Sequence, residues 1–291
     1  MCLTVESRHN YFLSTLYTAS FVKSCLDGTF NSKLIELLKI SQLEKYFTAE
    51  YTLEQILSEI YNHLAKNYRS EYIYKNTIAN ELLINKHHIS EAKLFTEFSA
   101  VQSQLDVLIV NGTTTAYEIK TELDNLERLP VQLQSYQSMF DKVYVVTHER
   151  NIEKIKGIVD DAVGILVLSG NNNIETERDA ISNIHRFNIE NIFSALRKNE
   201  YIDIVNTHFG YTPQVPNTKI FTECLSLFKE LSTDQVQTYF INALRTRQLC
   251  QYQINLIESV NYSLKILFLE RNLTKVQCCK LAQSLQSHPY T

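Results

Sequence analysis

Glycine and proline are scarce in this chain, which has six glycines and four prolines among 291 residues. Collagen-like, linker-like and low-complexity sequences need far more of both residues, so these classes are excluded. The glycines are also too dispersed for a Walker or dinucleotide-binding loop, which argues against ATP hydrolysis. No G-x-S-x-G sequence is present, so a serine hydrolase of that type is not indicated.

Long apolar runs and zinc-binding patterns are missing as well. No segment reaches the roughly 18 uninterrupted apolar residues of a membrane span, and the N-terminus lacks a basic stretch that runs into an apolar one. None of the six cysteines forms a C-x-x-C pair or lies at a zinc-like spacing from a histidine. We therefore expect a cytoplasmic protein with ordinary thiols and no contact with a membrane.

Neither sign of charge is in large excess, since 28 lysines and arginines stand against 32 aspartates and glutamates. A chain coated in positive charge is excluded, so any contact with nucleic acid must use a local basic patch. The content of 44% hydrophobic and 21% charged residues is typical of a folded domain and excludes disorder as the dominant state.

The spacing of apolar residues divides the chain into three parts. We expect a helical N-terminal extension over residues 1–68, a mixed α/β core over residues 69–175 and a helical C-terminal region over residues 176–291. Short β-branched runs predict strands at 94–98, 105–110, 115–120, 143–147 and 164–168. Helical spacing predicts helices at 70–83, 129–140, 152–158, 184–198, 221–231, 235–249, 252–269 and 274–285. The predicted fold class is therefore α/β (α+β), with a mixed sheet of about five strands flanked by helices.

Three charged residues interrupt the otherwise apolar strands of a predicted β-hairpin. Glu118 and Lys120 are two residues apart on one strand and so share a face. A two-residue turn at Asn111 and Gly112 would turn Glu118 away from Asp106. A three-residue loop over 111–113 would place Asp106 opposite Glu118, and we predict this longer loop although Asn-Gly favours the shorter one.

Two carboxylates about 4 Å apart repel by about 4 kcal/mol at an effective dielectric constant near 20. A divalent cation relieves this repulsion, and oxygen ligands with room for water suit Mg²⁺ or Mn²⁺. Lys120 beside such an ion could orient or deprotonate an attacking water, so the pattern predicts metal-assisted hydrolysis of a phosphodiester. An ion network on a solvated sheet face is the alternative.

With the segment that follows, the sequence resembles the PD-(D/E)xK nuclease superfamily, in particular its RecB-like branch. Gln132 and Tyr136 match the Q-x-x-x-Y motif that this branch carries on the helix after the E-x-K strand. Residues four apart share a helix face, so both can reach a phosphate or a bound water. Leu105 stands where the family's name has a proline, a common departure within the superfamily.

The resemblance implies a restriction-endonuclease-like core and a site that holds Mg²⁺ or Mn²⁺. It implies that Asp106, Glu118 and the carbonyl group of Ile119 bind the metal, while Glu71 on a preceding helix adds an outer or second-metal ligand. The sequence E-Y-x-Y-K-N around Glu71 is similar to that of a group of poorly characterised bacterial proteins with this fold. Glu71 could instead only pair with Lys75 one turn later.

Other candidates have weaker support. Glu97 and Glu81 are rivals for the third carboxylate. Arg128 is a phosphate-binding candidate with a surface role as the equal alternative. His87 and His88 could contact phosphate or metal, although we favour a solvated histidine pair.

The function predicted from the sequence is a metal-dependent nuclease that cleaves nucleic acid, with DNA favoured as the substrate. The alternative is a nuclease-fold module that binds nucleic acid or a partner protein without cutting. Such a module would suit a bacterial defence or toxin-like complex with the product of a neighbouring gene. Loss of metal binding and cleavage after a change at Asp106 or Glu118 would distinguish the two.

Overall fold

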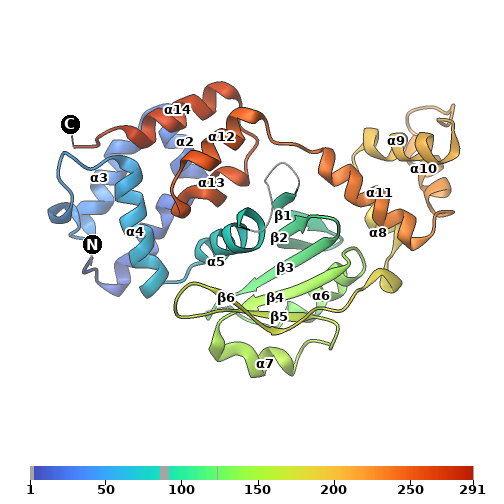
Figure 1. The fold of residues 1–291 in the computed structure, drawn as a ribbon, viewed down its shortest axis with the longest axis horizontal. Helices are drawn as coiled ribbons and strands as arrows, with labels where there is room; N and C mark the ends of the chain where they lie inside the picture. Colours follow the sequence, from blue (N-terminus) through green and yellow to red (C-terminus); the bar gives the residue numbers. More distant parts are fainter. Residues whose placement is uncertain (1–2, 86–91, 123, 291) are drawn as a thin grey trace. The chain divides into compact units, whose positions relative to one another are not determined.

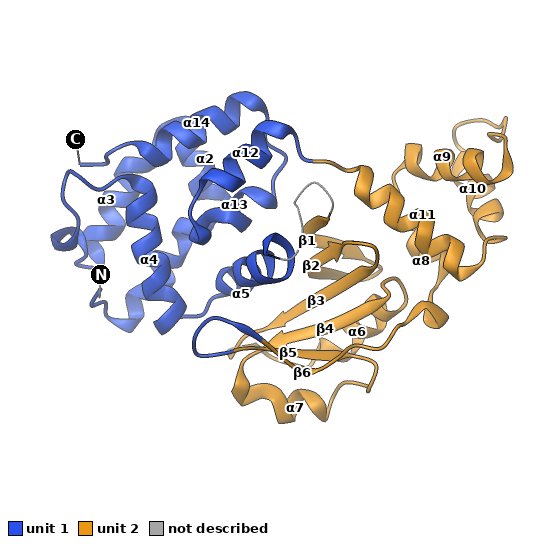
Figure 2. Cartoon of the chain, in the orientation of Figure 1, with its two compact units in different colours: residues 1–86, 169–174, 249–291 blue, residues 87–168, 175–248 orange. Residues whose placement is uncertain are grey.

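The computed structural model describes residues 3–85, 92–122 and 124–290. The chain forms two compact units, shown in different colours in Figure 2. The helical unit contains residues 1–86, 169–174 and 249–291, and the sheet unit contains residues 87–168 and 175–248. Apart from the short segment 169–174, the chain therefore builds the sheet unit in one stretch and returns to the helical unit near residue 249. The predicted boundaries at residues 68 and 175 were placed where the spacing of apolar residues changes. The boundaries of the two units are instead defined by contacts between residues.

The helical unit combines helices from both ends of the chain. It contains α1 (Asn10–Ser14), α2 (Ala19–Asp27), α3 (Phe30–Ile40), α4 (Leu53–Asn67), α5 (Glu71–Ile78), α12 (Gln251–Ser259), α13 (Lys265–Leu269) and α14 (Lys275–Gln286). Thr52 and Thr274 form capping boxes that satisfy free backbone N–H groups at the starts of α4 and α14. Helix α14 packs against α2 and α4, so the C-terminal helix completes a core that the N-terminal helices begin.

A buried asparagine links α5 to the C-terminal part of the helical unit. Asn76 is fully buried, and its amide group donates to the hydroxyl of Tyr61 and to the carbonyl oxygen of Tyr262, each at 3.0 Å. Its side-chain oxygen accepts from the backbone N–H of Ile266 at 3.2 Å. Because a buried amide must be hydrogen-bonded, Asn76 fixes the segment before α13 against α5. A π-helical turn, Ala79–Ile84, continues α5.

The sheet unit is built on a mixed sheet of six strands in the order β1 to β6. The strands are β1 (Lys93–Ala100), β2 (Ser103–Val110), β3 (Thr114–Lys120), β4 (Lys142–Thr147), β5 (Gly164–Leu168) and β6 (Ile174–Arg178). Strands β1, β2 and β3 pair in antiparallel fashion, whereas β3, β4 and β5 are parallel. The predicted mixed α/β class is confirmed, with six strands where about five were expected.

The helices of the sheet unit are α6 (Leu129–Gln137), α7 (Ile152–Lys156), α8 (Ile189–Ser194), α9 (Lys198–Phe209), α10 (Ile220–Phe228) and α11 (Thr233–Thr246). Helix α6 packs against β2 and β4, and α11 packs against β2. Helix α10 packs against α8 and α9, and α8 packs against α11. One hydrophobic core joins alternate side chains of the strands, such as Leu108 and Val145, to helix residues such as Leu133, Phe193 and Phe240. Among the described residues, no helix combines the length and the apolar character that a membrane span requires.

Two predicted helices differ from the observed ones, and one strand was not predicted. Strand β6 was not expected because its sequence is polar and its middle residues are exposed, as suits a sheet edge. The helix predicted over 184–198 is a 3₁₀ turn, Ile184–Arg186, followed by α8, and α9 was not predicted. The helix predicted over 252–269 is broken between α12 and α13, where the backbone N–H of Asn261 bonds the carboxylate of Glu54 at 2.7 Å.

Candidate functional site

The β2–β3 hairpin has the register that the sequence predicted. The ladder runs from Val110 paired with Thr114 to Val107 paired with Tyr117, and residues 111–113 form the loop. Gly112 occupies the left-handed region with φ of 103°, which a side chain would disfavour. The three-residue loop is therefore confirmed, and the next residues beyond the ladder are Asp106 and Glu118.

Asp106 lies at a gap in the β1–β2 ladder and one residue beyond the end of the β2–β3 ladder. Leu105 and Leu108 both face the helix-covered core, so the alternation of side chains along β2 breaks between them. Opposite Asp106 on β1, Glu97 has φ of 53°, a left-handed conformation that is uncommon for a residue with a side chain. The carboxylate of Asp106 accepts a hydrogen bond from the backbone N–H of Ile119 at 2.6 Å. Asp106 thus links β2 to β3 through its side chain.

Glu118 is the centre of a buried polar network on the helix-covered side of the sheet. It is 1% exposed. Its Oε1 atom accepts from Lys120 Nζ and from Gln132 Nε2, both at 2.6 Å. Its Oε2 atom lies 2.8 Å from the hydroxyl of Tyr136, which is also 2.9 Å from the carbonyl oxygen of Gln104. Both carboxylate oxygens therefore have donors, and the charge of Lys120 is matched by that of Glu118.

The Q-x-x-x-Y helix, α6, meets the E-x-K strand at Glu118. Pro130 lies in the first turn of α6, where its missing N–H costs no hydrogen bond. Gln132 and Tyr136 are one turn apart and both reach Glu118, as the shared helix face predicted. The Oε1 atom of Gln132 is buried, and no partner for it exists among the described residues. It is thus an acceptor available beside Glu118 and Lys120.

Burial sets the electrostatics of this network. Loss of solvation raises the pKa of Glu118 above its usual value of 4.5, while the contacts with Lys120, Tyr136 and Gln132 act in the opposite direction. Burial, followed by the negative charge of Glu118, raises the pKa of Tyr136. Tyr136 therefore stays protonated and remains a hydrogen-bond donor to the carboxylate.

Oxygen donors suited to a divalent cation lie beside this network. One carboxylate oxygen of Glu97 and one of Asp106 lie within 4.8 Å of each other. Glu97 is exposed and Asp106 is half-buried, so water can complete the coordination shell of an ion held there. Within the described part of the sheet unit, Glu118 is not part of this acidic group. The donor set thus fits Mg²⁺ or Mn²⁺, with Glu97 as the more favoured of the two predicted rivals.

The remaining predicted residues lie in the helical unit, immediately before α6, or outside the described residues. Glu71 belongs to the helical unit, where it begins α5 and pairs with Lys75 at 2.5 Å, so its role as a metal ligand stays a prediction. Glu81 belongs to the same unit and accepts a hydrogen bond from Asn85. Arg128 is exposed immediately before α6. His87 and His88 lie outside the described residues.

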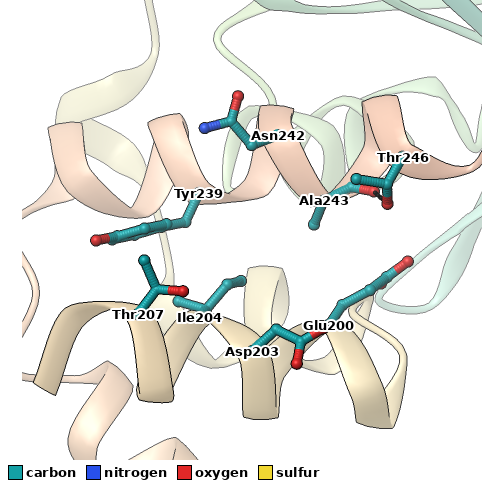
Figure 3. Close-up of a pocket in the computed structure, with 8 residues that line it drawn as sticks. All are labelled: Glu200, Asp203, Ile204, Thr207, Tyr239, Asn242, Ala243 and Thr246. Atoms are coloured by element: carbon teal, nitrogen blue, oxygen red, sulfur yellow. Dashed lines mark hydrogen bonds between the residues drawn. The ribbon is translucent and has the colours of Figure 1, made fainter. Parts of the chain in front are cut away.

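Sequence reasoning missed two features of the sheet unit. It did not foresee the left-handed backbone of Glu97, because a left-handed residue within a strand has no sequence signal. It also missed a pocket of about 290 Å³ between α9 and α11, lined by side chains such as Ile204, Tyr239 and Ala243 (Figure 3). Glu200 at one end of this pocket is bound by Arg247 through two contacts of 2.7 Å. The carboxylate of Glu200 therefore lines the pocket while it is paired with Arg247.

The fold and the site define a mixed α/β protein with a buried Glu–Lys pair, in which half-buried Asp106 and exposed Glu97 supply further carboxylates. The chain belongs to the Bacteriophage P4 protein cII family, whose model matches residues 64–265. Protein cII of Enterobacteria phage P4 is 27% identical over 175 residues, which is 57% of this chain. The match spans 64% of the length of that relative.

A solved structure also shows a partial similarity. The SPO1766 protein of unknown function from Silicibacter pomeroyi is 16% identical, and the match covers 37% of this chain and 68% of that one with a TM-score of 0.29. This similarity is too low to carry an argument about fold or function. The names of these similar proteins state no activity, so a functional conclusion must come from the site itself.

Proposed function

We propose that this protein is a metal-dependent nuclease that hydrolyses phosphodiester bonds, with DNA as the favoured substrate. The observation that carries the proposal is the convergence of Lys120, Gln132 and Tyr136 on Glu118, next to Asp106. This arrangement supports the resemblance to the PD-(D/E)xK superfamily, because the residues of both motifs share one site. The phage P4 protein cII family neither adds to this activity nor argues against it.

The residues of the site have separate roles in the proposed reaction. Asp106 and Glu97 would hold Mg²⁺ or Mn²⁺, which supplies positive charge to the phosphate and lowers the pKa of a bound water. Glu118 positions Lys120 through their 2.6 Å contact. Lys120 orients the attacking water and stabilises negative charge that develops on the phosphate. Gln132 offers its unpartnered amide oxygen to a proton of that water.

The proposed reaction is an in-line displacement at phosphorus. The water oxygen forms a bond to phosphorus as the bond to the 3′ oxygen breaks. The attacking water loses one proton to solvent, and the leaving 3′ oxygen takes up one proton from solvent. A 5′-phosphate remains, as the superfamily resemblance implies. The prediction that Glu118 and the Ile119 carbonyl group also bind the metal stays a prediction. In the structure, both oxygens of Glu118 accept hydrogen bonds from other side chains.

The Asp106→Asn variant provides the direct test. Asparagine keeps a side-chain oxygen for the N–H of Ile119 but removes the negative charge that an ion needs. We expect Mg²⁺-dependent cleavage of linear, circular and single-stranded DNA to fall at least about a hundredfold. We expect the free energy of unfolding to change by less than about 1 kcal/mol.

The matched control for this test is Glu175→Gln, which removes one exposed carboxylate from β6 of the same unit. It should cleave DNA as the unchanged protein does. Cleavage by Asp106→Asn at the unchanged rate would rule out the proposed site. Absence of cleavage by the unchanged protein, together with absence of Mn²⁺ binding in calorimetry, would favour the alternative of a non-catalytic binding module.

The raised pKa of Glu118 predicts the pH dependence of cleavage. Only ionised Glu118 can hold the ammonium group of Lys120 by charge, and the ionised fraction falls as pH falls through its pKa. Because burial raises this pKa above 4.5, activity should decline at a pH above 4.5 as the solution is acidified. A pH profile of kcat/KM checks this. An acid limb at or below pH 4.5 would show that ionisation of Glu118 does not control activity.

A further inference from the structure

The pocket between α9 and α11 has the lining of a site for a small planar ligand (Figure 3). Its volume of about 290 Å³ is close to the lower end of the range for small-molecule sites, about 300 to 1,000 Å³. Ile204 and Ala243 line it and are buried, whereas Asp203 and Asn242 line it and are exposed. The pocket therefore joins apolar surface to polar side chains that reach solvent, as ligand sites commonly do.

Tyr239 gives this pocket an ordered aromatic ring. Its hydroxyl lies 3.1 Å from Nδ1 of His208, and the two rings meet edge to face with centroids 5.8 Å apart. Figure 3 shows the ring reaching from α11 toward Thr207 of α9. Because the contacts with His208 hold the ring at both its hydroxyl and its body, Tyr239 offers a fixed surface on which a planar base can stack.

Asp203 and Asn242 supply unused hydrogen-bonding groups to the same pocket. Within residues 124–290 neither side chain has a hydrogen bond or an ion pair. Glu200, the other carboxylate of the pocket, differs because Arg247 donates to it in two contacts of 2.7 Å. An ionised carboxylate only accepts hydrogen bonds, so the ligand edge that meets Asp203 must carry N–H donors.

Guanine is the DNA base whose edge fits a carboxylate. Its pairing edge carries two adjacent donors, N1–H and the amino group on N2, which match the two oxygens of a carboxylate in a bidentate contact. Adenine and cytosine place an acceptor nitrogen beside their amino group, and an acceptor is repelled by a carboxylate. Thymine has a single N–H between two carbonyl groups. The acceptor-only side chain of Asp203 thus selects guanine among the four bases.

We propose that the pocket between α9 and α11 binds an unpaired guanine base, which stacks on Tyr239 and donates N1–H and N2–H to Asp203. The base must be unpaired, because a Watson–Crick pair uses the same two donors. It can belong to a single strand of DNA or to a free guanine nucleotide. For a base within DNA the inference rests on the proposed function, to which it adds a site that reads the sequence of the substrate.

Anisotropy of fluorescein-labelled single-stranded oligonucleotides, measured with a chelator in place of divalent metal, tests the site. One oligonucleotide contains only thymine, and the other has the same length and one central guanine. We expect the unchanged protein to bind the guanine oligonucleotide about tenfold more tightly, as one bidentate contact to a base predicts. Asp203→Asn should bind both equally, because its amide group turns N–H donors toward those of guanine.

Two further variants control for general effects on binding. Asp234→Asn removes an exposed carboxylate in the first turn of α11, outside the pocket lining, and should keep the tenfold preference. Tyr239→Phe keeps the ring and should bind the guanine oligonucleotide about as well as the unchanged protein, whereas Tyr239→Leu should bind it about tenfold more weakly. Because Asp203 is exposed, Asp203→Asn tests the site even where Tyr239→Leu fails to fold.

Two outcomes would overturn the guanine site. One is that Asp203→Asn keeps the preference for the guanine oligonucleotide. The other is that the unchanged protein shows no such preference and also fails to bind guanosine 5′-monophosphate in calorimetry. Binding of guanosine 5′-monophosphate that depends on Asp203, without a preference between the oligonucleotides, would support the base site and assign it to a free nucleotide.

The binding test can fail separately from the cleavage test, because the chelator removes the metal. A protein that prefers guanine through Asp203 but never cleaves DNA would contradict the proposed function and leave the base site supported. A protein that cleaves DNA but binds guanine no better than thymine, within DNA or as a nucleotide, would leave the proposed function standing and remove the base site.

Discussion

Replacement of Lys120 by methionine is expected to lower the rate of Mg²⁺-dependent DNA cleavage about a thousandfold, because the variant would lack the group that we propose orients water and stabilises charge on the phosphate. Methionine keeps most of the length and packing of the lysine side chain. Binding of Mn²⁺ in calorimetry should persist, since Asp106 and Glu97 remain. Single-turnover cleavage at saturating protein measures the effect on the chemical step.

Lys154→Met serves as the control for Lys120, because Lys154 is an exposed lysine on α7 of the same unit. Its cleavage rate should equal that of the unchanged protein. A rate for Lys120→Met within about threefold of the unchanged protein would exclude Lys120 from the reaction. A variant that loses cleavage and Mn²⁺ binding together would show instead that Lys120 supports the site structurally.

Replacement of Glu118 by alanine is expected to lower the free energy of unfolding by about 3–5 kcal/mol, as measured by urea denaturation. The change leaves the ammonium group of Lys120 in a site where its side chain is only 11% exposed. It also removes the acceptor for Gln132 and one of two acceptors for Tyr136. The cost comes from the groups that lose their partner, more than from the ion pair itself.

The ion pair of Lys156 and Glu177 offers a control with the same distance and a different environment. Its atoms are also 2.6 Å apart, but the two side chains are 36% and 37% exposed. Glu177→Ala should therefore cost less than about 1 kcal/mol. In the Glu118→Ala and Lys120→Met double variant, the loss should be smaller than the two single losses together. Equal losses for Glu118→Ala and Glu177→Ala would contradict the role of burial.

The central hairpin could be predicted from sequence because its determinants are local. Loop length fixes the pairing, so the position of Asp106 relative to Glu118 followed from choosing the three-residue loop. The shared face of Gln132 and Tyr136 followed from helix geometry in the same way. The sequence did not predict that both oxygens of Glu118 would accept hydrogen bonds. These bonds depend on the distance between α6 and β3, which is set by packing.

Features that depend on tertiary packing could not be predicted. The left-handed backbone of Glu97 arises from the gap in the ladder opposite Asp106. No residue pattern in the sequence predicts such a gap. Polar strand β6 was missed because edge strands lack an apolar pattern.

The return of the chain to the helical unit near residue 249 imposes an order on synthesis. Residues of the sheet unit have all left the ribosome once residue 248 is exposed, whereas the helical unit still lacks α12, α13 and α14. The sheet unit can therefore complete its core first, while buried surfaces of α2, α4 and α5 await the C-terminal helices. During translation the newly made N-terminal helices expose apolar surface for longer than any other part of the chain, so they are the segment most in need of chaperone protection.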